Sequence, residues 1–184
     1  MKSGKKILII GNLGYVGIPL VKHLKNIDKS NHKIYGLDKD LFFLNDYAKH
    51  DVEIYPDLQI YKDCRKVNLK KIPTKIDVVI YLAAVSNDPM GNVFKKATED
   101  INFQHCIKLA QQAKNLKVKK FIFASSCSMY GASGDNLKKE TDKLNPLTDY
   151  AISKVKAEQA LKKMSDKNFK TISLRFATAA GFSQ

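Results

Sequence analysis

Short apolar runs recur along this sequence and alternate with longer stretches in which apolar residues share one side of a helix. The short runs are rich in Ile, Val, Leu and Phe, and several of them stop at a glycine or a charged residue. Such runs are typical of strands that are buried in a parallel sheet. We therefore expect strands at Lys6–Ile10, Lys33–Leu37, Leu58–Lys62, Asp77–Leu82, Lys120–Ala124 and Thr171–Phe176.

The longer stretches place apolar residues three or four positions apart, as an amphipathic helix does. This spacing predicts helices over residues 14–24, 92–116 and 150–164. Residues 39–57 mix aromatic and charged side chains, and Pro56 interrupts them. We expect a loop there, with at most one helical turn.

Strands and helices in alternation favour an α/β fold: a doubly wound parallel sheet with helices on both faces. The Rossmann form of this fold has the strand order 3-2-1-4-5-6. The 184 residues are enough for one such domain. Ligands of these sheets bind beyond the carboxyl ends of the strands, so the residues that directly follow each strand are the candidates for chemistry.

Three glycines follow the first strand with the spacing GxxGxxG. Gly11 permits a tight turn, Gly14 lets a pyrophosphate approach the backbone, and Gly17 lets the next helix pack closely. Glycines also end strands for structural reasons, so the position between a strand and a helix is what makes the motif informative. The motif predicts a dinucleotide site along the loop, formed by Gly11, Asn12, Leu13, Gly14, Tyr15, Val16 and Gly17.

Asp38 ends the second predicted strand, 21 residues after Gly17. A carboxylate at this position accepts both hydroxyls of an adenosine ribose and repels a 2′-phosphate, which favours NAD over NADP. A turn or helix cap is the alternative role. Asp63 follows the third strand and is a candidate for the adenine edge, with a solvated surface carboxylate as the alternative.

Tyr150 and Lys154 are four residues apart on the last predicted helix, so both lie on one face. A nearby ammonium group lowers the pKa of a phenol, and Tyr150 could then exchange a proton with a substrate hydroxyl. Lys154 could also hold the nicotinamide ribose. Such a pair arises easily by chance in a lysine-rich chain, but Ser126 follows the fifth strand and could donate a hydrogen bond to the same oxygen. A helix cap is the alternative for this serine.

The chain carries 32 Lys and Arg against 18 Asp and Glu, a net charge of +14. The lysines are spread over the sequence and are not interleaved with aromatic residues, as a stacking platform for nucleic acid would require. We therefore expect a generic basic surface and no nucleic-acid partner. A basic nucleic-acid binder is kept as an alternative, which a steep salt dependence of affinity would mark.

Cysteine and histidine usage adds two expectations. Three cysteines without a CxxC pair indicate reduced thiols rather than a disulfide framework. Four histidines without ligand spacing give no support to a metal site. The chain has no secretory signal and no apolar run long enough to span a membrane, so we expect a soluble, cytoplasmic protein.

The motifs taken together resemble the extended short-chain dehydrogenase/reductases, specifically the NAD-dependent nucleotide-sugar epimerase/dehydratase family. The resemblance extends from Lys6 to Gly181. It rests on GNLGYVG, YGLD, KDCR, YLAA, DIN, SSCSMYG, YAISK and LRFATAAG, in this order along the chain.

The resemblance implies roles for individual residues. Ser126, Tyr150 and Lys154 match the catalytic set of the family, in which the tyrosine and lysine also contact the cofactor. Further cofactor contacts are implied for Asp38, Asp63, Cys64, Leu82, Ala83, Ala84, Asn102 and Ser125. Residues expected on the sugar side are Ser86, Asn87, Ser128 and Thr178.

The reaction is narrowed by the two residues after Ser126. The 4,6-dehydratases of this family have an Asp-Glu pair there, and this chain has Cys127 and Ser128. The resemblance therefore favours an epimerase that acts on a UDP-sugar through a transient 4-keto sugar. A nucleotide-sugar dehydrogenase or reductase is the second choice, and a non-catalytic NAD-binding module is the third.

Family members continue well past the last predicted strand. We accordingly expect residues 1–184 to form the NAD-binding domain with the catalytic set, while most of the lobe that grips the nucleotide sugar is absent. The family commonly dimerises through two helices, which here correspond to residues 92–116 and 150–164. A homodimer is therefore expected from the resemblance.

Overall fold

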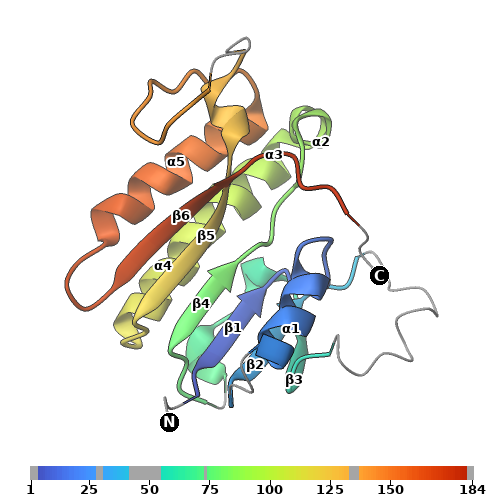
Figure 1. Cartoon of the computed structure of the whole chain (residues 1–184), viewed down its shortest axis with the longest axis vertical. Helices are drawn as coiled ribbons and strands as arrows, with labels where there is room; N and C mark the ends of the chain where they lie inside the picture. Colours follow the sequence, from blue (N-terminus) through green and yellow to red (C-terminus); the bar gives the residue numbers. More distant parts are fainter. Residues whose placement is uncertain (1–3, 28–30, 42–54, 73, 133–136, 182–184) are drawn as a thin grey trace.

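The computed structural model describes residues 4–27, 31–41, 55–72, 74–132 and 137–181. Six parallel strands form one sheet in the order β3-β2-β1-β4-β5-β6 (Figure 1). This confirms the predicted fold class and strand order. The strands are β1 (Lys6–Ile10), β2 (Lys33–Asp38), β3 (Leu58–Tyr61), β4 (Val78–Tyr81), β5 (Lys120–Ser126) and β6 (Lys170–Phe176).

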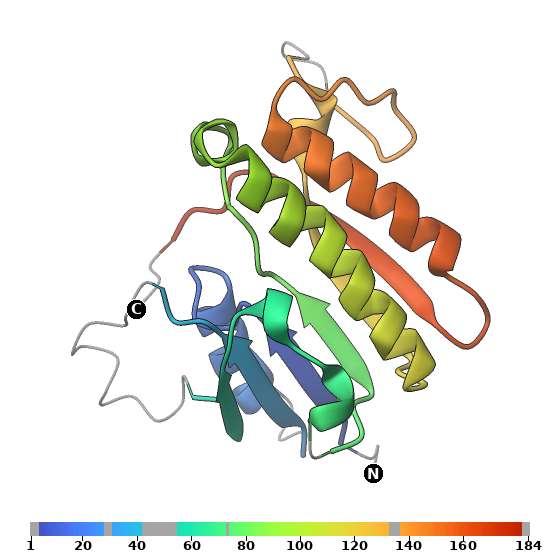
Figure 2. The ribbon, with the colours of Figure 1, turned by 180° about the vertical axis from the view of Figure 1, so that it is seen from behind.

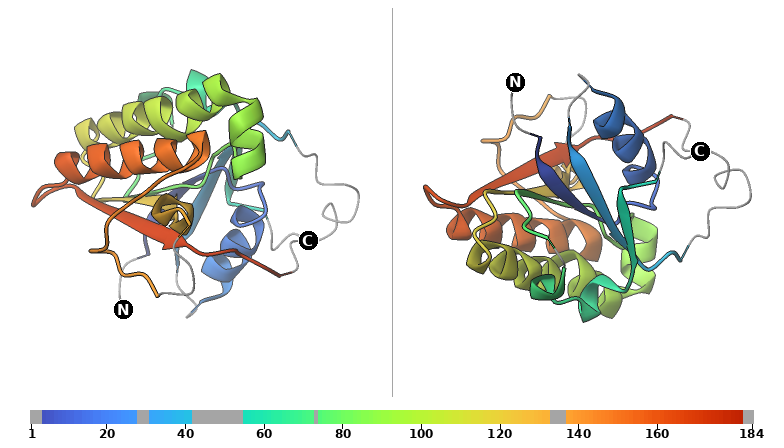
Figure 3. Two further views of the ribbon diagram at one scale, coloured as in Figure 1. Left: turned by 90° about the horizontal axis from the view of Figure 1, so that it is seen from above. Right: turned by 90° about the horizontal axis from the view of Figure 1, so that it is seen from below.

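Helices pack on both faces of this sheet. Helix α1 (Gly17–Asn26) lies on one face, and α4 (Cys106–Asn115) and α5 (Asp149–Met164) lie side by side on the other (Figures 2 and 3). The central strand β1 is covered from both sides, and the four residues after Lys6 are all buried. This double burial explains why β1 is an uninterrupted apolar run.

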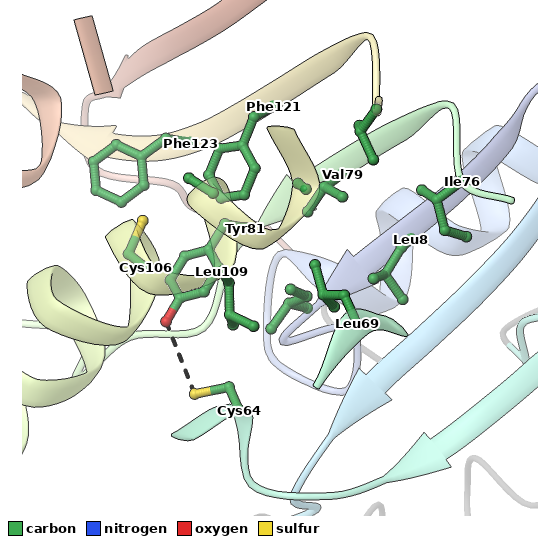
Figure 4. Close-up of a cluster of buried hydrophobic side chains, with 14 of the residues drawn as sticks. Leu8, Cys64, Leu69, Ile76, Val79, Tyr81, Cys106, Leu109, Phe121 and Phe123 are labelled. Atoms are coloured by element: carbon green, nitrogen blue, oxygen red, sulfur yellow. Dashed lines mark hydrogen bonds between the residues drawn. The ribbon is translucent and has the colours of Figure 1, made fainter. Parts of the chain in front are cut away.

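The larger part of the core lies between the sheet and helices α4 and α5 (Figure 4). Tyr81 is its largest polar member: its hydroxyl donates to the carbonyl of Ile101 at 2.7 Å and contacts Cys64 Sγ at 3.8 Å. The ring packs beside Phe121 and Phe123. The end of β4 is thereby fixed to the turn after β3 and to the helical segment behind it.

The helix predicted over residues 92–116 is interrupted near its start, at Phe94, and then runs from Lys95 to Asn115. A short helix α2 (Asp88–Val93), capped by Asn87, comes first and is followed by α3 (Lys95–Thr98). A π-helical turn (Glu99–His105) then leads into α4. The buried amide of Asn102 lies within this wider turn and bonds to other elements, which repeating apolar positions cannot reveal.

Other boundaries move by one to three residues. Helix α1 begins at Gly17 rather than at residue 14, because the preceding residues form the turn of the glycine-rich loop. The expectation for residues 39–57 falls mainly on residues 42–54, which lie outside the described residues.

The face that carries α1 is only partly covered. Among the described residues, α1 packs over β1, β2 and β4, whereas no helix lies over β6 on this side (Figure 1). Ile172, Leu174 and Phe176 of β6 are 38%, 45% and 40% exposed. We call these three residues the β6 stripe.

Candidate cofactor and catalytic site

A cavity of about 550 Å³ lies at the carboxyl ends of β1, β2, β3 and β4. The glycine-rich loop forms one wall, and the ends of β2 and β4 and the turn after β3 form the others. The predicted cofactor residues that line it are Gly11, Leu13, Gly14, Tyr15, Val16, Gly17, Asp38, Asp63, Cys64, Leu82, Ala83 and Ala84.

Two of the three glycines are required by close backbone contacts. Gly11 has a φ of +90°, and a Cβ there would lie 2.5 Å from the backbone nitrogen of Ala83. A Cβ at Gly17 would lie 2.5 Å from the carbonyl oxygen of Asn12. At Gly14 the nearest atom would be 3.5 Å away, so this glycine leaves room above the loop. This geometry matches the predicted division of roles.

Asn12 belongs to the same loop but lies outside the cavity lining. Its buried amide donates to Gln59 Oε1 on β3 at 2.7 Å, crossing over Gly36 of β2. A Cβ at Gly36 would come within 2.5 Å of the Asn12 amide nitrogen. The Asn12 side chain therefore anchors the loop to the sheet, and the supporting roles of Gln59 and Gly36 were not predicted.

Asp38 is held in place by two backbone groups. Its Oδ2 accepts the N–H of Leu13 at 3.1 Å, and its Oδ1 accepts the N–H of Asp40 at 2.9 Å. The carboxylate is partly buried and lines the cavity at the end of β2. A fixed negative charge beside the loop suits a ribose diol and disfavours a phosphate.

Asp63 forms an ion pair with Arg65 that sequence reasoning did not assign. Arg65 binds both carboxylate oxygens, with its NH2 group 2.7 Å from Oδ2. These hydrogen bonds lower the pKa of Asp63 to about 2. Arg65 also lines the cavity. The Asp-x-Arg spacing in the sequence was the signal from which this ion pair could have been predicted. Cys64 between them is buried, and burial raises the pKa of its thiol.

The catalytic candidates meet at the end of β5, outside the cavity lining. Ser126 caps the 3-10 turn Cys127–Tyr130 by accepting the N–H of Ser128 at 3.1 Å. Tyr150 stands in the first turn of α5, and a hydrogen bond joins its side chain to Ser126. Lys154 Nζ lies 5.5 Å from the centre of the Tyr150 ring. The structure thus brings the three predicted residues together.

The charge balance at Tyr150 differs from the expectation. Burial raises its pKa above the ordinary value, the bond to Ser126 lowers it in part, and Asp88 and Cys127 raise it further. Lys154 is fully enclosed, and its ammonium donates to the carbonyl of Ala124 at 2.7 Å. Burial lowers the pKa of Lys154 to about 8. Burial is therefore the main cause that sets the direction of the Tyr150 pKa shift.

Two further predicted residues have supporting contacts instead of cavity contacts. Asn102 bridges Val85 and Ser153, and so ties the end of β4 to α5. Ser125 donates to Glu158 of α5 at 3.0 Å. Glu158 is in turn paired with Arg175 of β6, an ion pair that sequence reasoning missed. Both contacts fix the ends of strands that carry the site.

The four residues expected on the sugar side are not gathered in one place. Ser86 lines the cavity, while Asn87 caps α2 by accepting the N–H of Met90. The Ser128 hydroxyl accepts from that of Ser126 at 3.1 Å. Thr178 is exposed in the segment after β6. That segment returns toward the glycine-rich loop, where Tyr15 donates to the carbonyl of Gly181 at 2.6 Å.

The described part of the chain carries neither a metal-binding cluster nor a membrane-crossing helix. No group of three or more His, Cys, Asp or Glu side chains is arranged to hold a metal ion there. In the same residues no helix combines the length and apolar character needed to cross a membrane.

The lining fits a dinucleotide. Gly11 and Gly17 leave no room for side chains where the loop turns, and Gly14 leaves the space above it open. Asp38 stands at one side of this space, and Asp63 and Arg65 stand beside it. A pyrophosphate over the loop, a ribose at Asp38 and an adenine near Asp63 would fit this lining in that order.

Comparison with known proteins identifies the family. The NAD dependent epimerase/dehydratase family matches residues 7–183. UDP-glucose 4-epimerase of Lactobacillus helveticus is 29% identical over 184 residues, which is 97% of this chain and 53% of the relative. dTDP-D-glucose 4,6-dehydratase of Dictyostelium discoideum is 34% identical over 84% of this chain and 39% of the relative.

Solved structures give the same result. UDP-N-acetylglucosamine 4-epimerase from Methanobrevibacter ruminantium M1, in complex with UDP-N-acetylmuramic acid, matches with a TM-score of 0.81 and 26% identity. The match covers 94% of this chain and 55% of that one. The UDP-Glc/GlcNAc 4-epimerase of Campylobacter jejuni matches with a TM-score of 0.79 and 27% identity, over 94% and 53% of the two chains.

The chain belongs to the NAD dependent epimerase/dehydratase family. Membership confirms the resemblance stated from the motifs and the prediction of NAD as cofactor. The chain spans about half the length of the curated relatives it matches.

Proposed function

We propose that this chain is the cofactor-binding and catalytic part of an NAD-dependent nucleotide-sugar 4-epimerase. The observation that carries the proposal is the meeting of Ser126, Tyr150 and Lys154 at the end of β5, on the same edge of the sheet as the dinucleotide cavity. Three side chains from two elements converge on one place, which a merely structural role does not require.

Tyr150 acts as the acid and base in this proposal. Its phenolate form takes the proton of the sugar 4-hydroxyl and returns one to the 4-keto sugar after reduction from the other face. Ser126 is hydrogen-bonded to the phenol and can donate to the same sugar oxygen. Bound NAD supplies the hydride acceptor, and its reduced form the donor. Lys154 holds positive charge 5.5 Å from the centre of the phenol ring, and in this proposal it would also hold the nicotinamide ribose.

The choice of epimerase over dehydratase rests on the two residues after Ser126. A dehydratase needs an extra acid and base to eliminate water. Cys127 and Ser128 offer a thiol and a hydroxyl in place of two carboxyl groups. Relatives of both kinds match this chain, so these side chains, rather than overall identity, support the choice of epimerase. A dehydrogenase or reductase of a nucleotide sugar is the second candidate.

The proposed substrate is a UDP-sugar, since solved neighbours include UDP-sugar epimerases. Ser86, Asn87, Ser128 and Thr178 are its candidate contacts. We propose that further polypeptide, corresponding to the part of the relatives beyond the matched half, completes the sugar site. The exposed β6 stripe supports this, because an apolar sheet face of this kind is normally covered.

Two properties extend the proposal. A homodimer through α4 and α5 is supported by Phe103, Ile107 and Ile152, which are apolar and only partly buried on this side of the molecule. A dimeric mass in light scattering is expected, and a monomeric mass would contradict it. A cytoplasmic location is supported by the three free cysteines, which are typical of reducing compartments.

The Tyr150→Phe substitution tests the catalytic role. The protein, together with the further polypeptide proposed to complete the sugar site, is incubated with NAD and UDP-glucose, and UDP-galactose formation is followed by chromatography. The substitution is expected to reduce turnover about 100-fold or more while thermal unfolding still shows NAD binding. Equal turnover in both proteins contradicts the proposal. Binding of NAD without conversion of any UDP-sugar favours the alternative of an NAD-binding module.

A further inference from the structure

Helix α2 packs against the first turn of α5, where Tyr150 stands (Figure 2). Two polar contacts hold the start of α5. The carboxylate of Asp88 in α2 accepts a hydrogen bond from the hydroxyl of Thr148, and Nζ of Lys95 in α3 lies 3.2 Å from the carboxylate of Asp149. The two residues directly before Tyr150 are therefore bonded to the helices α2 and α3.

Gly91 of α2 lies directly against the backbone of Tyr150. A Cβ at Gly91 would come within 2.8 Å of the Tyr150 Cβ and 3.1 Å of its backbone nitrogen. Gly91 is buried, and its carbonyl accepts the hydroxyl of Thr98. The position of α2 therefore limits where the phenol of Tyr150 can lie.

Thr148 links Asp88 to the first turn of α5. Its side-chain oxygen accepts the N–H of Ala151, which caps α5, while its proton goes to Asp88. Asp88 thus holds the cap of the helix that carries Tyr150 two residues later. This bond holds the carboxylate against the residue two positions before Tyr150, and its negative charge raises the pKa of the phenol.

Other groups also act on the Tyr150 phenol, and Cys127 raises its pKa in the same direction as Asp88. Cys127 approaches from the 3-10 turn after β5, and Ser126 supplies the hydrogen bond. Lys154 approaches from α5 itself, with its ammonium bonded to the carbonyl of Ala124. Among the described groups whose charge acts on the Tyr150 phenol, Asp88 is the one carboxylate.

We propose that Asp88 is a positioning residue for Tyr150: through Thr148 it fixes the first turn of α5 and keeps a negative charge beside the phenol. The inference rests on the proposed function for its catalytic meaning. Asp88 opposes loss of the phenol proton, so Tyr150 remains protonated until bound positive charge offsets the carboxylate. Asp88, which is not part of the set Ser126, Tyr150 and Lys154, thereby controls when Tyr150 loses its proton and becomes a base.

The test is a titration of Tyr150 in the 184-residue chain without ligands. Tyrosine is labelled with ¹³C at Cζ, the resonance is followed by NMR, and Tyr150→Phe assigns it. Asp88→Asn keeps an acceptor for Thr148 but removes the charge, and is expected to lower the midpoint by about half a pH unit. Asp149→Asn is the matched control, because it removes a neighbouring carboxylate that is paired with Lys95, and its midpoint should stay at the wild-type value.

Substitutions at Thr148 test the hydrogen bond between Thr148 and Asp88 separately from the charge of Asp88. Thr148→Val breaks the bond to Asp88 and releases the carboxylate, so the midpoint should fall. Thr148→Ser keeps the hydroxyl and should restore the wild-type midpoint. An unchanged midpoint in Asp88→Asn, or an unchanged midpoint in Thr148→Val, overturns the proposal. The titration needs neither NAD nor turnover, so an inactive chain with the expected titration counts against the proposed function alone.

Discussion

The carboxylate of Asp38 accepts the backbone N–H of Leu13 at 3.1 Å, so the end of β2 is bonded directly to the glycine-rich loop. The residue that is expected to select the cofactor also fixes the loop that is expected to hold its pyrophosphate. Charge and geometry at Asp38 can therefore be separated by a substitution that removes only one of them.

Asp38→Asn keeps an oxygen that can accept from Leu13 and removes the negative charge. We expect the preference for NAD over NADP to fall about tenfold, because a 2′-phosphate is no longer repelled. Isothermal titration calorimetry with both dinucleotides measures this ratio. Asp57→Asn is the control, since Asp57 also accepts a backbone N–H, from Ile34, at the opposite end of the sheet. An unchanged ratio in Asp38→Asn would show that the charge does not select the cofactor.

Gly11 and Gly14 are predicted to respond differently to the same added methyl group. Gly11→Ala should lower the free energy of unfolding by about 3 kcal/mol, because φ is +90° and the Cβ would meet Ala83. Gly14→Ala meets no atom closer than 3.5 Å and should change stability by less than about 0.5 kcal/mol. It should nevertheless weaken NAD binding at least tenfold, since the methyl group enters the pyrophosphate space. Urea unfolding measures the change in stability and calorimetry measures the change in NAD binding. Equal destabilisation by Gly11→Ala and Gly14→Ala would contradict the prediction.

The buried ammonium of Lys154 gives stability a defined pH dependence. Its pKa is about 8 in the folded chain and 10.5 in the ordinary state, so above pH 8 the unfolded chain binds more protons. At pH 7 the buried Lys154 charge lowers the free energy of unfolding by its full amount, and this destabilisation disappears as the pH rises to about 10.5. The wild type should therefore gain up to about 3 kcal/mol relative to Lys154→Met over this range. Urea unfolding of both proteins measures the difference, and a constant difference would mean that Lys154 is not buried as a cation.

The parts of the site that sequence predicted are those encoded locally. Gly11 and Gly17 follow a strand at fixed spacing, and Tyr150 and Lys154 share a helix face whatever surrounds them. The missed contacts join distant segments: Asn12 reaches Gln59, 47 residues away, and Thr148 reaches Asp88, 60 residues away. No periodicity connects such pairs.

The π-helical turn before β5 has the same explanation. Apolar residues recur at helical spacing through this turn, so the pattern indicates an ordinary helix. The turn contains Asn102, whose partners Val85 and Ser153 come from other parts of the chain. Burial, which raises the pKa of Tyr150, is likewise a property of the packed fold that no local pattern contains.

Thermal unfolding of the 184-residue chain with NAD, with NADP and without ligand tests the central claim most directly. A ligand that binds only the folded state stabilises it by about 2.7 kcal/mol at a hundredfold excess over its Kd. We predict a clear rise in Tm with NAD and a much smaller rise with NADP. An unchanged Tm with NAD, at concentrations that saturate related dinucleotide sites, would contradict the assignment of the cavity between Gly11 and Asp38.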